Sequence, residues 1–87
     1  MNGRTIVGWN LRRLRVGRGL TMETLAGEAD VDPSYVARIE RATVNSSIDV
    51  LERLTAVLGA RLGELFAEPA ADATAPKPLR GGRRPRR

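Results

Sequence analysis

The stretch that decides the fold is TMETLAGEADVDPSYVARIE, residues 21–40. It contains two segments with helical patterning, residues 22–29 and residues 33–41. Thr21 is a strong N-cap for the first segment. Asp32 caps the second, and a proline follows at its first helical position, where a missing N–H costs nothing. The stretch therefore predicts two short helices separated by a tight turn of about three residues.

The apolar residues of this stretch indicate how the two helices meet. Ala26 faces the bend, and it is small because the helices cross closely there. Val31 lies just past the turn, and Val36 and Ile39 occupy the inner side of the second helix. This pattern predicts a helix-turn-helix motif.

Further helices are expected on both sides of the motif. We expect a first helix over residues 5–18, a fourth over residues 48–58 with Ser46 or Ser47 as its cap, and a fifth over residues 61–66. Apolar residues recur at helical spacing in these segments, and no run alternates with the period of two that marks a strand. The predicted fold class is all-α, a compact five-helix domain.

The charge of the chain is segregated along its 87 residues, although 15 Lys+Arg and 10 Asp+Glu sum to only +5. Residues 1–22 carry five arginines and no acid, residues 23–69 carry four arginines and nine acids, and residues 70–87 carry six basic residues and one acid. We predict one domain over residues 1–68. The Pro/Gly/Arg-rich tail, residues 69–87, has too little apolar surface to offset its ordering entropy, so we expect it to be disordered.

The chain contains no Cys and no His. These zeros exclude disulfides, thiolate or Cys/His metal sites, and Ser-His or Cys-His nucleophilic catalysis. We also find no Gly-rich phosphate loop or carboxylate pair in a plausible pocket, so we expect no enzyme, cofactor or metal. No apolar run approaches the roughly 20 residues that span a bilayer, and no signal peptide is visible, so we expect a cytoplasmic protein.

Many spaced positions carry a resemblance over residues 5–67. They are Val7-Gly8, Leu11 to Arg15, Gly19 to Thr21, Leu25-Ala26, Val31, Ser34 to Arg41, Asn45, Ser47-Ile48, Leu51, Leu54, Leu58-Gly59 and Leu62 to Phe66. This pattern resembles the Cro/C1-type helix-turn-helix family, also called the XRE family. The resemblance implies a five-helix DNA-binding domain, usually a homodimer, that reads operator DNA and controls transcription.

Four positions depart from the family pattern. Met22 replaces a Gln that usually reaches DNA, Asp30 and Ala42 stand where Gly is common, and Ser46 replaces a usual Pro. None of these changes breaks the expected fold. Met22 in place of Gln removes one expected polar contact to DNA.

The second helix of the motif can be oriented from its own residues. At about 100° per residue, Ser34, Arg38 and Arg41 lie opposite Val36 and Ile39. If the apolar pair faces the core, Arg38 faces the DNA groove and is the best candidate for a bidentate contact to guanine. The full set of candidate DNA-binding residues is Thr21, Met22, Pro33, Ser34, Tyr35, Arg38, Arg41 and Asn45. For Tyr35, packing against the preceding helix is an equal alternative.

The resemblance also assigns structural roles. It pairs Glu40, on the inner side of its helix, with Arg15 as a structural ion pair. It places Leu62, Leu65 and Phe66 at a dimer interface, with closure of the monomer core as the alternative role. Trp9 points away from the apolar stripe of its helix, and is either partly exposed or a partner contact.

We therefore expect a sequence-specific transcriptional regulator, a repressor or autoregulator, that binds a palindromic operator in double-stranded DNA as a homodimer. A restriction-modification controller and a DNA-binding antitoxin are alternatives within this class. A protein-interaction module on the same scaffold is the alternative from another class, and no membrane partner is expected. The arginines of the tail have three possible roles: an inert end, a phosphate grip, or a minor-groove arm.

Overall fold

Four α-helices and one short 3-10 helix make up the computed structural model, which describes residues 2–70. The order is α1 (Gly3–Gly17), α2 (Met22–Ala29), α3 (Pro33–Glu40), α4 (Ile48–Leu58) and η1 (Leu62–Phe66). No strand occurs in this range, which confirms the all-α prediction. The fifth element differs from the expectation because it is a 3-10 helix of five residues. The predicted tail lies outside the described residues, apart from its first two.

Side-chain caps set where the helices begin. Asn2 Oδ1 accepts the Thr5 N–H at 3.0 Å, so α1 begins two residues earlier than expected. Thr21 and Asp32 cap α2 and α3. Ser47, rather than Ser46, caps α4, because Ser47 Oγ accepts the Val50 N–H at 3.1 Å. Each cap satisfies a backbone donor that has no partner within the helix.

Two non-glycine residues adopt the left-handed conformation just after α2 and α3. Asp30 has φ 60° and ψ 48° at the end of α2, and Ala42 has φ 63° after α3. An aspartate tolerates this region because its short polar side chain bonds locally, whereas an alanine incurs a steric cost of about 1–2 kcal/mol. The turn after α3 is therefore held against a local preference.

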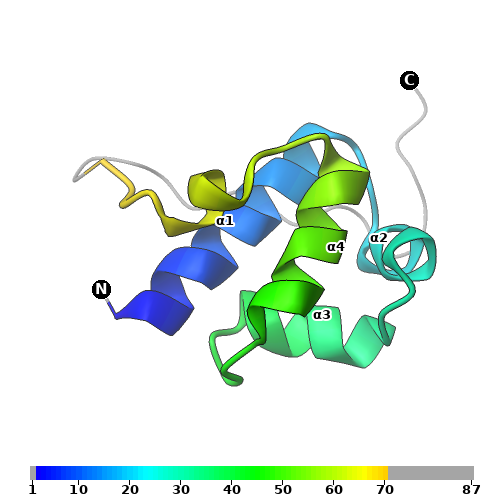
Figure 1. Ribbon diagram of the computed structural model, residues 1–87, viewed down its shortest axis with the longest axis horizontal. Helices are drawn as coiled ribbons and strands as arrows, with labels where there is room; N and C mark the ends of the chain where they lie inside the picture. Colours follow the sequence, from blue (N-terminus) through cyan, green and yellow to red (C-terminus); the bar gives the residue numbers. More distant parts are fainter. Residues whose placement is uncertain (1, 71–87) are drawn as a thin grey trace.

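The helices surround a single core, with α3 packed against both α1 and α2 (Figure 1). In the same way α4 packs on α2, and η1 closes over α1. The buried apolar residues are Leu11, Leu25, Ala26, Ala29, Val36, Ile39, Leu51, Leu54, Leu58 and Leu65. Within residues 2–70, no helix combines the length and the hydropathy that a membrane span requires.

The crossing of α1 and α3 is very close at Gly8. A Cβ atom on this residue would lie 2.6 Å from the Ile39 carbonyl oxygen and 2.8 Å from that of Glu40. Both distances are far inside van der Waals contact, and the obstacle is backbone. Glycine is thus required here by the approach of two helices rather than by its own dihedral angles.

A buried amide fastens η1 to α1. Asn10 Nδ2 lies 3.0 Å from the carbonyl oxygen of Leu65 and 2.7 Å from that of Ala67. With the backbone of η1 fixed in this way, Leu65 is completely buried while Phe66 is 46% exposed. The Leu65 side chain therefore fills the core of its own subunit, which is the alternative role that the sequence left open for it. Leu62 is partly buried against the same core.

Candidate nucleic-acid interface

The two faces of α3 differ sharply in exposure. Val36 and Ile39 are buried at 0% and 2% exposure. Ser34, Arg38 and Arg41 are exposed on the opposite face. A helix anchored in this way presents polar side chains outward from a fixed position, which is the arrangement that a recognition helix needs.

Arg38 is stacked on its neighbour Tyr35. The guanidinium carbon lies 5.5 Å from the centre of the Tyr35 ring, within the range of a cation–π interaction. Tyr35 is itself partly buried against the core. The Tyr35 side chain therefore packs against the core on one side and stacks with Arg38 on the other. This contact holds the Arg38 guanidinium near the surface of α3.

Ser34 is engaged in the cap of α3. Asp32 Oδ1 accepts the Ser34 N–H at 2.8 Å and the Ser34 hydroxyl at 2.9 Å. The backbone hydrogen bond from Ser34, followed by the hydroxyl bond and the charge of Arg38, lowers the pKa of Asp32 below its ordinary 3.8. The Ser34 hydroxyl keeps its lone pairs, so it remains able to accept a hydrogen bond.

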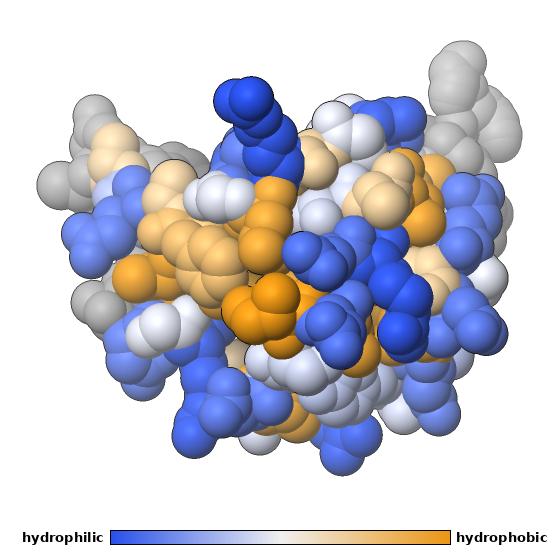
Figure 2. Space-filling model, in the orientation of Figure 1, coloured by the Kyte–Doolittle hydropathy of each residue, from blue (hydrophilic) through white to orange (hydrophobic). Residues whose placement is uncertain are grey.

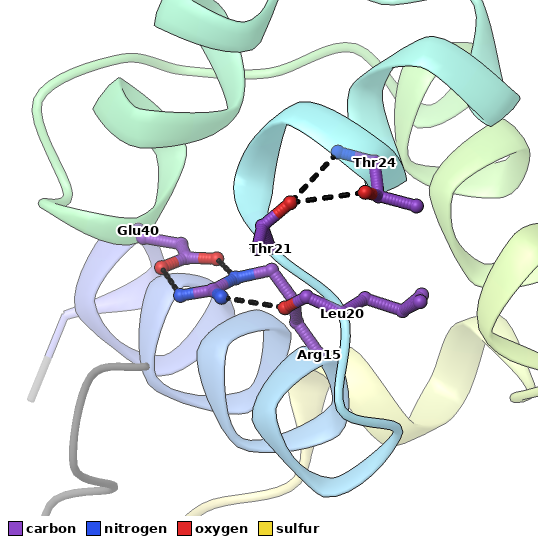
Figure 3. A network of polar contacts seen from close by, with 5 residues as sticks. All are labelled: Arg15, Leu20, Thr21, Thr24 and Glu40. Carbon is purple, nitrogen blue, oxygen red and sulfur yellow. Dashed lines mark hydrogen bonds and ion pairs between the residues drawn. The ribbon is translucent and has the colours of Figure 1, made fainter. Parts of the chain in front are cut away.

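A buried ion pair holds the inner side of α3 on α1 (Figure 3). Arg15 Nε donates to Glu40 Oε2 at 2.6 Å, and Arg15 Nη2 donates to Glu40 Oε1 at 3.0 Å. The two side chains are only 4% and 7% exposed. Arg15 Nη1 also donates to the Leu20 carbonyl oxygen at 2.9 Å, just before α2. One guanidinium thus connects α1, α3 and the entry to α2.

The other candidate residues lie around α3 with different exposures. Thr21 accepts the Thr24 N–H at 3.1 Å and so orders the first turn of α2 (Figure 3). Met22 is partly buried against the core, whereas Pro33 and Asn45 are exposed. Asn45 belongs to the loop between α3 and α4. These exposed residues flank the outer face of α3, and Met22 turns toward the protein.

Sequence reasoning missed two polar contacts that fix this scaffold. One is Asn10, whose spacing from Val7 and Leu14 places it on the core stripe of α1, where a buried amide needs partners. The other is Arg18, whose guanidinium donates to the Leu58 carbonyl oxygen at the end of α4. The Asn10 position carried a signal, since a polar residue interrupts an apolar stripe there. The partner of Arg18 depends on how the chain closes.

Comparisons with known proteins agree with this architecture. A family model described as a helix-turn-helix domain matches residues 6–68. A hypothetical transcription factor from Neisseria meningitidis is 32% identical over 66 residues, covering 76% of this chain and 62% of that protein. The control protein C.BamHI from Bacillus amyloliquefaciens is 34% identical over 66 residues, covering 75% of this chain and 82% of that protein.

A solved structure shows the same fold. The restriction-modification controller protein C.AhdI from Aeromonas hydrophila is 38% identical, with a TM-score of 0.70 over 72% of this chain and 96% of that one. The chain spans less than two thirds of the Neisseria protein but nearly all of C.AhdI. The family model covers α2, α3, α4 and η1 completely, and α1 from its fourth residue onward. The chain therefore belongs to the Cro/C1-type (XRE) family of helix-turn-helix transcriptional regulators.

Proposed function

We propose that this protein is a repressor or autoregulator that binds a palindromic operator as a homodimer, with α3 in the major groove of each half-site. The observation that carries the proposal is the outer face of α3. There Arg38 is exposed and stacked on Tyr35, while the inner face is locked by the Arg15–Glu40 pair. A rigid helix with an ordered arginine suits bidentate contact to the O6 and N7 atoms of guanine.

Contacts to the DNA backbone would orient this helix. The N–H groups at the start of α2, ordered by the Thr21 cap, form a helix N-terminus that favours a phosphate. Arg41 and Asn45 are exposed at the other end of α3, and Pro33 and Ser34 are exposed at its beginning. We assign phosphate contact to Arg41 and Asn45, and groove contact to Ser34 and Arg38. Backbone contacts of this kind position a protein without reading sequence.

An apolar surface supports the homodimer. Ile48 is 52% exposed and Phe66 is 46% exposed, and both line a groove of about 570 Å³ together with Val7, Val44 and Leu51. Figure 2 shows apolar surface gathered in the left and central part of the view. Exposed apolar patches mark interaction sites, and a two-fold axis joins such a patch to its own copy. In this proposal Phe66 and Ile48 replace Leu65 as the dimer contacts.

A role as the controller of a restriction-modification system is the second candidate. It is favoured by the restriction-modification controller protein C.AhdI, of which the chain covers 96%, and by the control protein C.BamHI, of which it covers 82%. The same DNA-binding surface would serve this role, so the two candidates differ only in the genes controlled.

Selection from random duplex DNA, followed by footprinting, tests the proposal. We expect an enriched sequence with two-fold symmetry and half-site centres about 10 base pairs apart. Weak binding without sequence enrichment would instead support the protein-interaction module and would overturn the proposal.

The dimer is tested separately by a Phe66→Asp variant in sedimentation. We expect a monomer with unchanged helicity, because Phe66 is outside the buried core. A dimer of undiminished stability in this variant would remove Phe66 from the interface.

A further inference from the structure

A second, basic groove lies where α1 meets the C-terminal end of α3. Its volume is about 230 Å³, and it is separate from the apolar groove beside Phe66. The groove is lined by Thr5, Gly8, Trp9 and Arg12 from α1, and by Glu40, Arg41 and Ala42 at the end of α3. It exists because Gly8 lets the two helices touch, which brings Arg12 and Arg41 to one place although they are far apart in sequence.

The groove carries net positive charge. Arg12 and Arg41 contribute two guanidinium groups. The Glu40 carboxylate, which also lines the groove, is already neutralised by the bidentate contact from Arg15 at 2.6 and 3.0 Å. The C-terminus of α3 adds a partial negative charge of roughly half an elementary unit. The two arginines outweigh that partial charge, so the groove favours an anion.

One nitrogen of Arg12, a residue that lines this groove, lacks the acceptor that a buried donor requires. Arg12 Nε is buried and has no hydrogen-bond partner among the described residues. Leaving a buried donor without an acceptor is costly, especially on a charged group. An anionic oxygen bound in the groove would provide that acceptor once the Arg12 side chain turns to expose Nε. The partly buried Trp9 ring lines the same groove and would cover the bound anion from one side.

The groove is continuous with the outer face of α3. Arg41 lines the groove and also shares the exposed face with Ser34 and Arg38, which lie seven and three residues before it in the chain. A duplex that receives Arg38 in its major groove must carry its sugar-phosphate backbone past one end of α3. Arg41 stands at the C-terminal end, with Arg12 beside it.

We propose that Arg12 and Arg41 together bind a phosphodiester of the DNA backbone at the C-terminal end of α3, with Trp9 against the bound strand. This inference rests on the proposed DNA-binding function and extends the interface from the helix-turn-helix onto α1. It assigns roles to Arg12 and Trp9, which the resemblance to the family leaves without one. The contact is independent of sequence and adds affinity and orientation only.

The test compares Arg12→Gln with Arg13→Gln, which removes the same charge one residue away. Arg13 is exposed and donates to Asn10 Oδ1 at 3.2 Å, outside the groove. Affinity for a short mixed-sequence duplex is measured by fluorescence anisotropy over a series of salt concentrations. Loss of one phosphate contact should reduce the slope of log K against log salt by about 0.9 per protomer in Arg12→Gln only. Arg12→Lys, which keeps the charge, should retain the slope of the unmodified protein.

Equal slopes for the Arg12→Gln and Arg13→Gln proteins would overturn the inference. Trp9 provides an independent readout, because it is the only tryptophan in the chain. Its emission should become less accessible to acrylamide when the duplex binds, and unchanged quenching would also overturn the inference. Neither failure touches the proposed function, which is defeated only if the full chain shows no sequence preference in the selection experiment.

Discussion

The two faces of α3 meet opposite physical requirements within eight residues. On the inner face, Val36 and Ile39 are buried and the Glu40 carboxylate is held by two hydrogen bonds from Arg15. On the outer face, the exposed Arg38 side chain is stacked on the ring of Tyr35, with 5.5 Å between the guanidinium carbon and the ring centre. The inner face fixes where the helix lies, and the outer face decides what the helix can read. Substitutions on the two faces should therefore separate stability from recognition.

Glu40→Ala is expected to have the largest effect on the inner face. It leaves the nearly buried Arg15 guanidinium without its anion, and breaking a buried pair in this way costs about 3–5 kcal/mol. We expect the urea midpoint, followed by circular dichroism, to fall sharply. The double variant Arg15→Met/Glu40→Leu is the control, since replacing both partners by apolar residues costs far less. A Glu40→Ala protein with an unchanged midpoint would show that the pair does not anchor α3.

Gly8→Ala should give the next largest loss of stability. The added Cβ would lie 2.6 Å from the Ile39 carbonyl oxygen, so α1 and α3 must separate, and overpacking of this kind costs about 1–3 kcal/mol. Gly27→Ala is the matched control, because a Cβ on Gly27 meets nothing within 4 Å. Alanine should stabilise that exposed helical position slightly. Equal midpoints for the two variants would contradict the close crossing.

Arg38→Ala tests the outer face. Its effect on the free energy of unfolding should be within about 0.5 kcal/mol, as for other surface positions. It should lose about 1–3 kcal/mol of discrimination at one base pair of the selected operator. Anisotropy titrations with single-base-pair variants of the operator measure this loss, and Arg38→Lys controls for charge. A variant that keeps full discrimination would place the specific contact elsewhere on α3.

The residues on the inner face of α3 could be predicted from the sequence more easily than the residues around the groove between α1 and α3. Apolar spacing identified Val36 and Ile39, and local capping chemistry identified Thr21 and Asp32, because both signals act within a few residues. The contacts of Arg18 and Asn10, and the position of Arg12 beside Arg41, could not be derived in this way, because they join different elements and exist only after the helices pack. Tertiary contacts of this kind leave little trace in local sequence.

The choice between the two roles of Leu65 has a different physical reason. The sequence predicted a helix over residues 61–66 and left Leu65, like Phe66, between a dimer interface and the monomer core. In the 3-10 helix that forms, a turn takes about 3.0 residues instead of 3.6, which changes the direction of each side chain. Asn10 then donates hydrogen bonds to the Leu65 and Ala67 carbonyl oxygens. These bonds fix the backbone so that Leu65 is buried and Phe66 is exposed. Helix type and a long-range contact decided this position, and neither could be read from the local pattern.

Ala42→Gly is expected to make a smaller change of opposite sign. Ala42 has φ 63°, so glycine would relieve a steric cost of about 1–2 kcal/mol at the C-terminal end of α3. The greater freedom of glycine in the unfolded chain offsets about 0.4–1 kcal/mol of that gain. We expect a net rise in the denaturation midpoint. Asp30→Gly should gain less, because aspartate tolerates its φ of 60° better. A lower midpoint for Ala42→Gly would mean that the alanine methyl contributes packing that outweighs its strain.

The smallest effect is expected at the other end of α3, where Asp32 makes stability depend on pH. The hydrogen bonds from Ser34 lower the pKa of Asp32, so the folded state prefers the carboxylate more strongly than the unfolded chain does. Its contribution is therefore fully present above the ordinary value of 3.8 and is lost as the pH falls through the lower folded pKa. Thermal melting of the unmodified protein and Asp32→Asn between about pH 5 and pH 2 isolates this contribution, since asparagine still caps a helix but does not titrate. We expect the difference in melting temperature between the two proteins to shrink as the pH falls. A difference that stays constant would mean that the Asp32 charge does not stabilise the cap, and that the amide and the carboxylate hold the end of α3 equally well.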